Sequence, residues 1–342
     1  MKMSLERFPR SILEKMLDIC WCQWSALGIY TNIAPEMKWA IDPEALICAT
    51  MFYGRYDPRL FDEVLDWISV NEKILNFNRL KKTADAFGPK YKACLGASLE
   101  YVAADKKSPR FLSTVDRWKE SRLVEEEYLF LSWGSDTGYD VKDTAPTFGA
   151  WGFLRNEPNL RGLSGKPDMR NSANLFLRLR KLFGVTSRAS ILGYLLLKGD
   201  GNSMRISKAV NVNQRNVYHI LNEMTEGEFL LQWSGGRESV FSIDREPWLE
   251  FFDIDKGLRF IRWADVFSTF QFLLEDWAEN GKAYSTAYLA ASRIRDNSSK
   301  LLKGLDMDGV GYRIPDLSRY RGESYFHAFA EHIQAYLDRI VS

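Results

Sequence analysis

The chain is predicted to be mainly α-helical, with a helical N-terminal domain, a central unit of helices followed by two short strands, and a helical C-terminal domain. Three observations predict this class. Apolar residues recur at helical spacing along much of the sequence. Asp-Pro pairs at 42–43 and 57–58 are strong helix starts. A Gly-Gly turn separates two strand-like runs between residues 229 and 243.

The N-terminal domain is expected to cover residues 1–131. An apolar stripe that begins at Ile12 continues through Ile33, and further helices are expected at 44–53, 58–68 and 77–86. Asp62, Glu63 and Asp66 fall within about one helical turn of each other. We interpret them as the polar side of an amphipathic helix, with Arg59 near enough to pair, rather than as a metal or acid–base site.

Residues 132–172 are expected to form an irregular linker because Gly, Pro and small polar residues are frequent there. The central unit then covers residues 173–247. It opens with a helix from Asn174 to Phe183, an arm expected to pack against the domain core or a second subunit. After the central unit, residues 248–342 are expected to form the C-terminal helical domain, with helices at 258–279, 283–295 and 324–340.

Within the central unit, a helix beginning near Ser187 has an apolar face and ends at residues 199–202, which are expected to be a turn. Ser203 is expected to cap a short helix that ends at Val210. A turn follows, and Asn213 is expected to cap the next helix, 214–226, whose apolar stripe includes Val217 and Leu221. Strands are expected at 229–233 and 238–243, with Arg237 in the hairpin turn between them.

This order of helices, turn and strands is that of a winged helix-turn-helix, whose second helix lies in the DNA major groove. Amide and guanidinium side chains pair with adenine and guanine edges, and they are concentrated at the start of helix 214–226. The candidate DNA-binding residues are Ser203, Arg205, Lys208, Asn213, Gln214, Arg215, Asn216, Tyr218, His219 and Arg237.

Residues 187–243 resemble the winged-helix domain of bacterial regulators of the MarR and ArsR type. The run from Asn174 to Val185 also resembles a little-characterised group of bacterial winged-helix proteins. The resemblance implies a regulator of transcription that binds double-stranded DNA in a sequence-specific manner, with a repressor expected. We expect a homodimer, because one recognition helix reads few base pairs and two-fold pairing doubles the site.

Charge is distributed unevenly along the sequence. The net charge is only +1. From Arg155 to His219, however, there are twelve Lys or Arg and three acidic residues. This clustering is the pattern expected where one face of a protein meets phosphates.

Other features restrict the possible functions. The four cysteines form no CxxC pair, so free thiols in a reducing cytoplasm are expected. The N-terminus does not resemble a signal peptide and no run approaches eighteen apolar residues, so no membrane partner is expected. No cofactor, metal site or catalytic residue is expected. A small-molecule or protein effector is compatible with the sequence, which does not identify one.

Two alternatives to DNA binding are considered. The first is a protein-interaction module, as in an antitoxin or a complex subunit, that uses the winged helix as its contact surface. The second and weaker alternative is a ribonuclease, because Arg321 and His327 have the Arg-x5-His spacing of HEPN ribonucleases. Gly322 and Glu323 do not provide the polar residue usual after that Arg, so the chain is expected not to be an enzyme.

Overall fold

In the computed structural model, which describes residues 3–106, 108–134, 138–235 and 238–342, both Asp-Pro pairs start helices as the sequence predicts. Asp42 accepts a hydrogen bond from the Ala45 amide and Asp57 accepts one from the Leu60 amide, each at 3.1 Å. The predicted mainly helical class is confirmed. The N-terminal helices are α1 (Arg7–Ala26), α2 (Pro43–Tyr53), α3 (Pro58–Asn71), α4 (Phe77–Ala84), α5 (Pro89–Lys106) and α6 (Pro109–Trp118).

Helix α1 ends earlier than its apolar stripe predicts. The sequence predicts continuation to Ile33, but the helix ends at Ala26 and Gly28 follows with a φ of +100°. A Cβ at this position would lie 2.8 Å from the Lys166 carbonyl oxygen. Gly28 therefore permits both the left-handed conformation and the close approach of the later segment.

Residues 132–172, the predicted linker, pack against the N-terminal helices. Strand β1 (Glu127–Tyr128) pairs in parallel with β2 (Phe153–Leu154), and the short helix α7 (Pro146–Gly149) lies between them in the sequence. Trp151 is fully buried beside α5, where its indole Nε1 donates a hydrogen bond to Glu100. Gly and Pro content here predicts irregular backbone correctly, but buried aromatic residues fix the segment in place.

The interpretation of the α3 acidic residues as an exposed polar face is wrong. Glu63 is 2% exposed and Asp66 is 8% exposed. Arg161 pairs with Glu63, and Asp66 accepts a hydrogen bond from the Ser164 amide at 3.1 Å. The residues that follow β2 cover this face of α3, so the partners are about a hundred positions away along the chain rather than one helical turn away.

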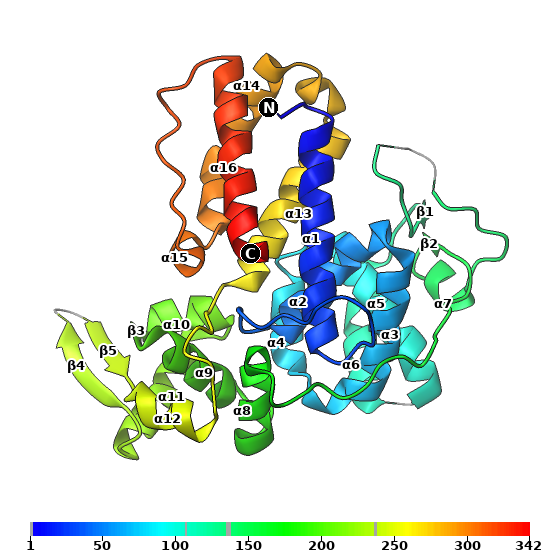
Figure 1. Ribbon diagram of the computed structural model, residues 1–342. Helices are drawn as coiled ribbons and strands as arrows, with labels where there is room; N and C mark the ends of the chain where they lie inside the picture. Colours follow the sequence, from blue (N-terminus) through cyan, green and yellow to red (C-terminus); the bar gives the residue numbers. More distant parts are fainter. Residues whose placement is uncertain (1–2, 107, 135–137, 236–237) are drawn as a thin grey trace.

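The two outer helical segments share one hydrophobic cluster, which runs from Phe8 to Ile340. Helix α1 contacts both α13 and α16, and the Phe8 ring lies 5.5 Å from Trp277 and 5.6 Å from Phe326. Figure 1 shows α1 beside α13 and α16. The C-terminal helices are α13 (Trp263–Glu279), α14 (Ala287–Gly304), α15 (Met307–Val310) and α16 (Glu323–Val341). Sequence analysis predicts these segments as separate domains, because apolar stripes do not identify their partners.

The central unit contains one antiparallel sheet with the strand order β3-β5-β4. Its third strand differs from the sequence prediction, which places a turn at residues 199–202. Gly201 pairs with Phe241 there, and Gly199 ends the preceding helix with a φ of +88°. The elements are α8 (Leu175–Phe183), α9 (Ser187–Lys198), β3 (Asp200–Asn202), α10 (Ser203–Val210), α11 (Gln214–Glu226), β4 (Leu231–Gly235), β5 (Glu238–Ser242) and α12 (Arg245–Phe251).

A second hydrophobic cluster fills the central unit and continues beyond the predicted boundary at residue 247. Leu249 of α12, and then Phe252, Leu258 and Phe260, belong to the same cluster as the buried residues of α9. Cys20, Cys22, Cys48 and Cys94 are free thiols, as predicted. Among the described residues, no helix combines the length and apolar character needed to cross a membrane.

Candidate nucleic-acid interface

Helix α11 has one buried face and one exposed polar face. Val217, Leu221 and Met224 are buried, as their spacing predicts. The helix contacts α9 and α10 within the chain. At its start the Asn213 side chain accepts a hydrogen bond from the Arg215 amide at 2.9 Å, which confirms the predicted cap. The cap fixes where α11 begins and therefore which side chains occupy its first turn.

The predicted recognition residues on α11 are brought together on its solvent-exposed side. Gln214, Arg215, Asn216, Tyr218 and His219 are all exposed. Weak polar contacts link this group to neighbouring helices: Gln214 donates to the Ser203 hydroxyl at 3.3 Å and Asn216 to the Ser187 hydroxyl at 3.5 Å. Arg215 has no ion pair or side-chain hydrogen bond among the described residues, so its guanidinium is available to a ligand.

The predicted residues of α10 fall into two groups. Ser203 and Arg205 lie at its start, next to α11, and Arg205 is 4.0 Å from Asp200. Ser203 is not the cap, which corrects the prediction: Asn202 accepts the hydrogen bond from the Arg205 amide at 2.7 Å because β3 places it one position earlier. Lys208 lies near the end of α10, in a cleft that faces α4. The structure thus separates Lys208 from the α11 group.

Two other candidates need separate treatment. Asn213 is exposed, but its side-chain oxygen is occupied by the cap, so its amide nitrogen is the group left for a ligand. Arg237 lies outside the described residues. Strands β4 and β5, which flank that turn, extend to the edge of the molecule in Figure 1. They pair from Leu231 with Ser242 to Gly235 with Glu238.

The positive charge between Arg155 and His219 is weaker at the surface than the sequence indicates. Four of the twelve cations form ion pairs with acidic residues outside that segment. The pairs are Arg155 with Asp62, Arg161 with Glu63, Arg180 with Glu44 and Arg188 with Glu223. A charge count over residues 155–219 does not reveal these ion pairs, because each acidic partner belongs to another element. The basic segment is therefore partly a set of internal links rather than a phosphate-binding face.

An exposed apolar row consists of Phe229, which precedes β4, and of Leu231 and Trp233 on β4. Phe229, Leu231 and Trp233 are 58%, 67% and 46% exposed. Leu231 and Trp233 share one face of the strand, because side chains alternate along it. Gln232 lies between them and pairs with Phe241, which points into the core. The row thus lies on the outer face of the sheet, on a strand that forms its edge.

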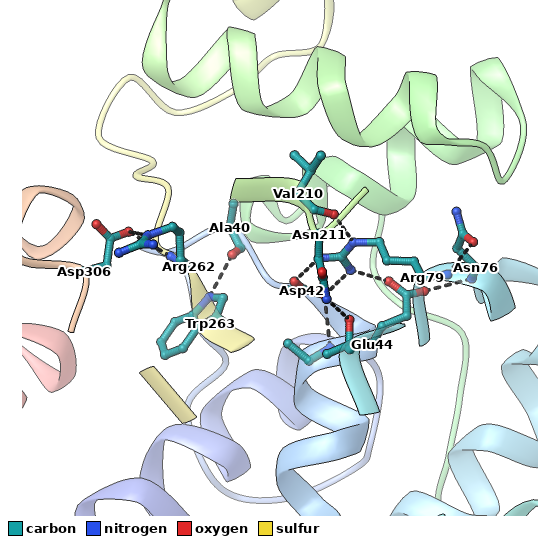
Figure 2. A network of polar contacts seen from close by, with 12 residues as sticks. Ala40, Asp42, Glu44, Asn76, Arg79, Val210, Asn211, Arg262, Trp263 and Asp306 are labelled. Carbon is teal, nitrogen blue, oxygen red and sulfur yellow. Dashed lines mark hydrogen bonds and ion pairs between the residues drawn. The ribbon is translucent and has the colours of Figure 1, made fainter. Parts of the chain in front are cut away.

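A buried ionic network joins the central unit to the N-terminal helices, and sequence analysis missed it (Figure 2). Glu44 is fully buried and pairs with Arg79 at 2.7 Å and Arg180 at 2.6 Å. Arg79 also pairs with Asp42 and donates from Nε to the Val210 carbonyl at 2.8 Å. The end of α10 is therefore fixed to α4. The Asp42-Pro43-Glu44 motif indicates a helix start, but nothing in it predicts two distant arginine partners.

The carboxylates and guanidinium groups of this network stabilise each other in their ionised forms. Burial acts to raise the pKa of Asp42, but the adjacent Arg79 guanidinium outweighs burial and holds that pKa below its ordinary value. For Arg79, burial acts to lower the pKa and the carboxylates of Asp42 and Glu44 outweigh it, so the net shift is upward. An ionised network with this many hydrogen bonds fixes the relative position of the elements that it joins, although the buried Nε of Arg180 has no hydrogen-bond partner among the described residues.

Arg321 and His327, the candidate ribonuclease pair, differ in exposure. Arg321 is exposed and precedes α16, where its backbone exchanges hydrogen bonds with the Ser324 hydroxyl. His327 is half-buried and lies against Phe326, with ring centroids 5.3 Å apart. No hydrogen bond between the two side chains occurs in the described part of the chain.

Comparison of the chain with protein-family models, curated proteins and solved structures returned no match.

Proposed function

We propose that the chain is a sequence-specific regulator of transcription that binds double-stranded DNA through a winged helix-turn-helix in its central unit. The exposed polar side of α11 is the observation that carries the proposal. Arg215 and Asn216 stand in the first turn, where a recognition helix presents side chains to base edges. The order α9, β3, α10, α11, β4, β5 and the three-stranded antiparallel sheet support the same proposal.

In this proposal α11 enters the major groove and the start of α10 approaches the phosphates. Ser203 and Arg205 are the α10 residues placed for that contact, since both lie beside the first turn of α11. Gln214, Arg215 and Asn216 supply groups that can pair with adenine or guanine edges. Tyr218 and His219 extend the exposed surface along the helix. Four cations of the basic segment are paired within the chain, so phosphate contacts would come from the cations that remain exposed, such as Arg205.

Salt dependence tests whether the interface meets phosphates. Affinity for a duplex would be measured by fluorescence anisotropy across a salt series. Log affinity is expected to fall linearly with log salt, with a slope of about −0.9 for each phosphate contacted. Because Arg205 and Arg215 are both exposed, we expect a slope that is clearly different from zero. An affinity that is independent of salt would contradict the proposal.

We also propose that the regulator acts as a cytoplasmic bacterial homodimer, with its dimer contacts outside the buried faces of α8 and α14. Leu175, Phe176 and Leu179 of α8 are buried within the chain, and so are Ala290 and Ala291 of α14. These faces are used internally. The row of Phe229, Leu231 and Trp233 is an exposed apolar alternative. Sedimentation of the wild type and of Leu231→Ser tests its role: the variant should shift toward monomer.

The same row favours a second candidate function, contact with a different protein. Large exposed apolar residues are typical of protein-interaction surfaces rather than of surfaces that meet phosphates. If the chain sediments as a monomer and binds no duplex DNA at low salt, the interaction-module candidate replaces the regulator. Dimer formation that is lost in Leu231→Ser, together with salt-dependent DNA binding, supports the regulator instead.

A further inference from the structure

We propose that the cleft between α4, α10 and the start of α13 binds a small phosphate-bearing anion. The cleft has a volume of about 300 Å³ and is lined by all three parts of the chain. Lys82 and Asp85 line it from the end of α4, Lys208 and Asn211 from the end of α10, and Arg262 and Trp263 from the start of α13. Its volume lies at the lower end of the range for small-molecule sites, roughly 300–1,000 Å³.

The charges that line the cleft leave two lysines without acidic partners. Every carboxylate in the lining has a basic partner: Asp42 pairs with Arg79, Asp85 with Lys92 at 2.5 Å and Asp265 with Arg262 at 2.6 Å. Lys82 and Lys208 form no ion pair with any described residue, although both line the cleft. They come from elements on opposite sides of the junction. Both line the same cleft, so an anion bound there is attracted by both charges.

The start of α13 adds a third favourable feature. This helix has 17 residues, and Trp263, Ala264 and Asp265 of its first turn line the cleft. Its cap residue Arg262 makes no side-chain capping bond. The amides of Trp263 and Asp265 already donate to the carbonyls of Ile261 and Arg262, so the start of α13 adds only the partial positive charge of its dipole to an anion held mainly by the two lysines. Lysine binds phosphate as a point charge, so the site does not require a fixed bidentate geometry.

The side of the cleft formed by Arg79 and Asn211 is held by several hydrogen bonds. A fixed wall of this kind favours a small ligand over an extended polymer. Arg79 is fixed by Asp42, Glu44 and the Val210 carbonyl, and Asn211 donates to the Thr83 hydroxyl at 3.0 Å (Figure 2). Trp263 is fully buried and donates to the Ala40 carbonyl at 3.0 Å. The anion would therefore bind against the contacts that fix α10, and this site does not depend on the DNA-binding proposal.

Titration calorimetry with inorganic phosphate in a chloride buffer tests the site directly. The wild type should bind one phosphate per chain, and the double variant Lys82→Glu with Lys208→Glu should bind at least about tenfold more weakly, a loss of about 1.4 kcal/mol. Lys282→Glu, in an exposed turn distant from the cleft in sequence, should bind as the wild type does. If charge reversal prevents folding, as judged by circular dichroism, Lys82→Gln with Lys208→Gln provides the same comparison.

Two results would overturn the inference. One is the absence of phosphate binding to the wild type at millimolar concentration, and the other is equal binding by the wild type and the folded double variant. A parallel titration with duplex DNA separates the sources of phosphate. If the double variant loses DNA affinity while the wild type ignores inorganic phosphate, the lysines contact the DNA backbone and the small-anion site is refuted. If the double variant loses phosphate binding but keeps DNA binding, the small-anion site is supported and is separate from the DNA interface.

Discussion

At the scale of single residues, Glu44 has the largest expected effect on stability. It is fully buried and accepts from two guanidinium groups, so its removal leaves Arg180 with only the Ile74 carbonyl among its described polar contacts. Breaking a buried ion pair from one side typically costs about 3–5 kcal/mol. We therefore expect Glu44→Gln to lower the free energy of unfolding by about that amount in urea titrations.

The exposed Glu14 of α1 supplies the matched control for this prediction. Glu14→Gln should change the free energy of unfolding by less than about 0.5 kcal/mol, as surface substitutions usually do. Equal and small effects of the two substitutions would show that the buried network contributes little to stability.

Asp42 makes part of the stability depend on pH. Its folded pKa lies below its ordinary value, since Arg79 outweighs the effect of burial. A carboxyl group of this kind stabilises the fold fully above its unfolded pKa of about 3.9, and the contribution is lost as pH falls through the folded pKa. Asp42→Asn keeps a side chain that can cap α2 but removes the charge. It should be destabilising by about 1–3 kcal/mol at pH 7.

The same comparison at lower pH tests the direction of the pKa shift of Asp42. The difference in unfolding free energy between wild type and Asp42→Asn should shrink below about pH 4, because the unfolded wild-type chain then binds a proton at Asp42 that the folded state, with its lower pKa, does not yet bind. Urea titrations of both proteins at pH 7 and at pH 3 measure it. A difference that stays constant or grows on acidification would contradict the assigned direction of the pKa shift.

At the scale of secondary-structure elements, Gly193 sets the close packing of α8 on α9. A Cβ there would lie 2.5 Å from the Phe176 ring, much closer than a real contact. Alanine favours a helix over glycine by about 1 kcal/mol, but overpacking costs typically 1–3 kcal/mol. We expect Gly193→Ala to lower the thermal midpoint.

The exposed Gly281 gives the contrasting case, since a Cβ there meets nothing within 4 Å. Gly281→Ala should leave the thermal midpoint nearly unchanged. A stabilised Gly193→Ala would mean that Phe176 moves at little cost and that the α8–α9 contact is looser than described.

The elements that sequence analysis predicts well are those determined by neighbouring residues. Asn213 and the apolar stripe of α11 depend on contacts within about one or two turns, so the helix and its exposed side were both predictable. Strand β3 was not, because Gly201 and Asn202 suit a turn equally well and pair with β5 only after the chain has folded. Lys208 was grouped with α11 for the same reason: sequence position does not reveal that the end of α10 faces α4.

At the scale of the whole molecule, the shared hydrophobic cluster predicts that the first and last helices unfold together. Lys15 of α1 pairs with Asp338 of α16, and Phe8 packs on Phe326. Native-state hydrogen exchange should give core amides of α1 and α16 opening free energies within about 1 kcal/mol of each other. Substantially easier opening of α16 would show that the C-terminal helices form a separate cooperative unit.

The long-range contacts of this kind could not be derived from the sequence. Apolar stripes on α1 and α16 show that each helix buries a face, but many pairings satisfy that requirement. The charge excess between Arg155 and His219 is an incomplete guide to the surface for a related reason, because Glu44 and Asp62 are distant in sequence from their arginine partners but adjacent to them in space. Fold class was therefore predictable, whereas the joining of the parts was not.

The central claim, that α11 reads base sequence, is tested most directly by Arg215→Ala on two DNAs. A preferred duplex selected from a random pool and a random duplex would each be titrated with wild type and variant at fixed salt. The guanidinium is exposed and has no ion-pair partner among the described residues, so the substitution should not affect folding. We predict a loss of about 1–3 kcal/mol on the preferred duplex and a much smaller loss on random DNA. Equal losses on both duplexes, or none on either, would contradict base reading by α11.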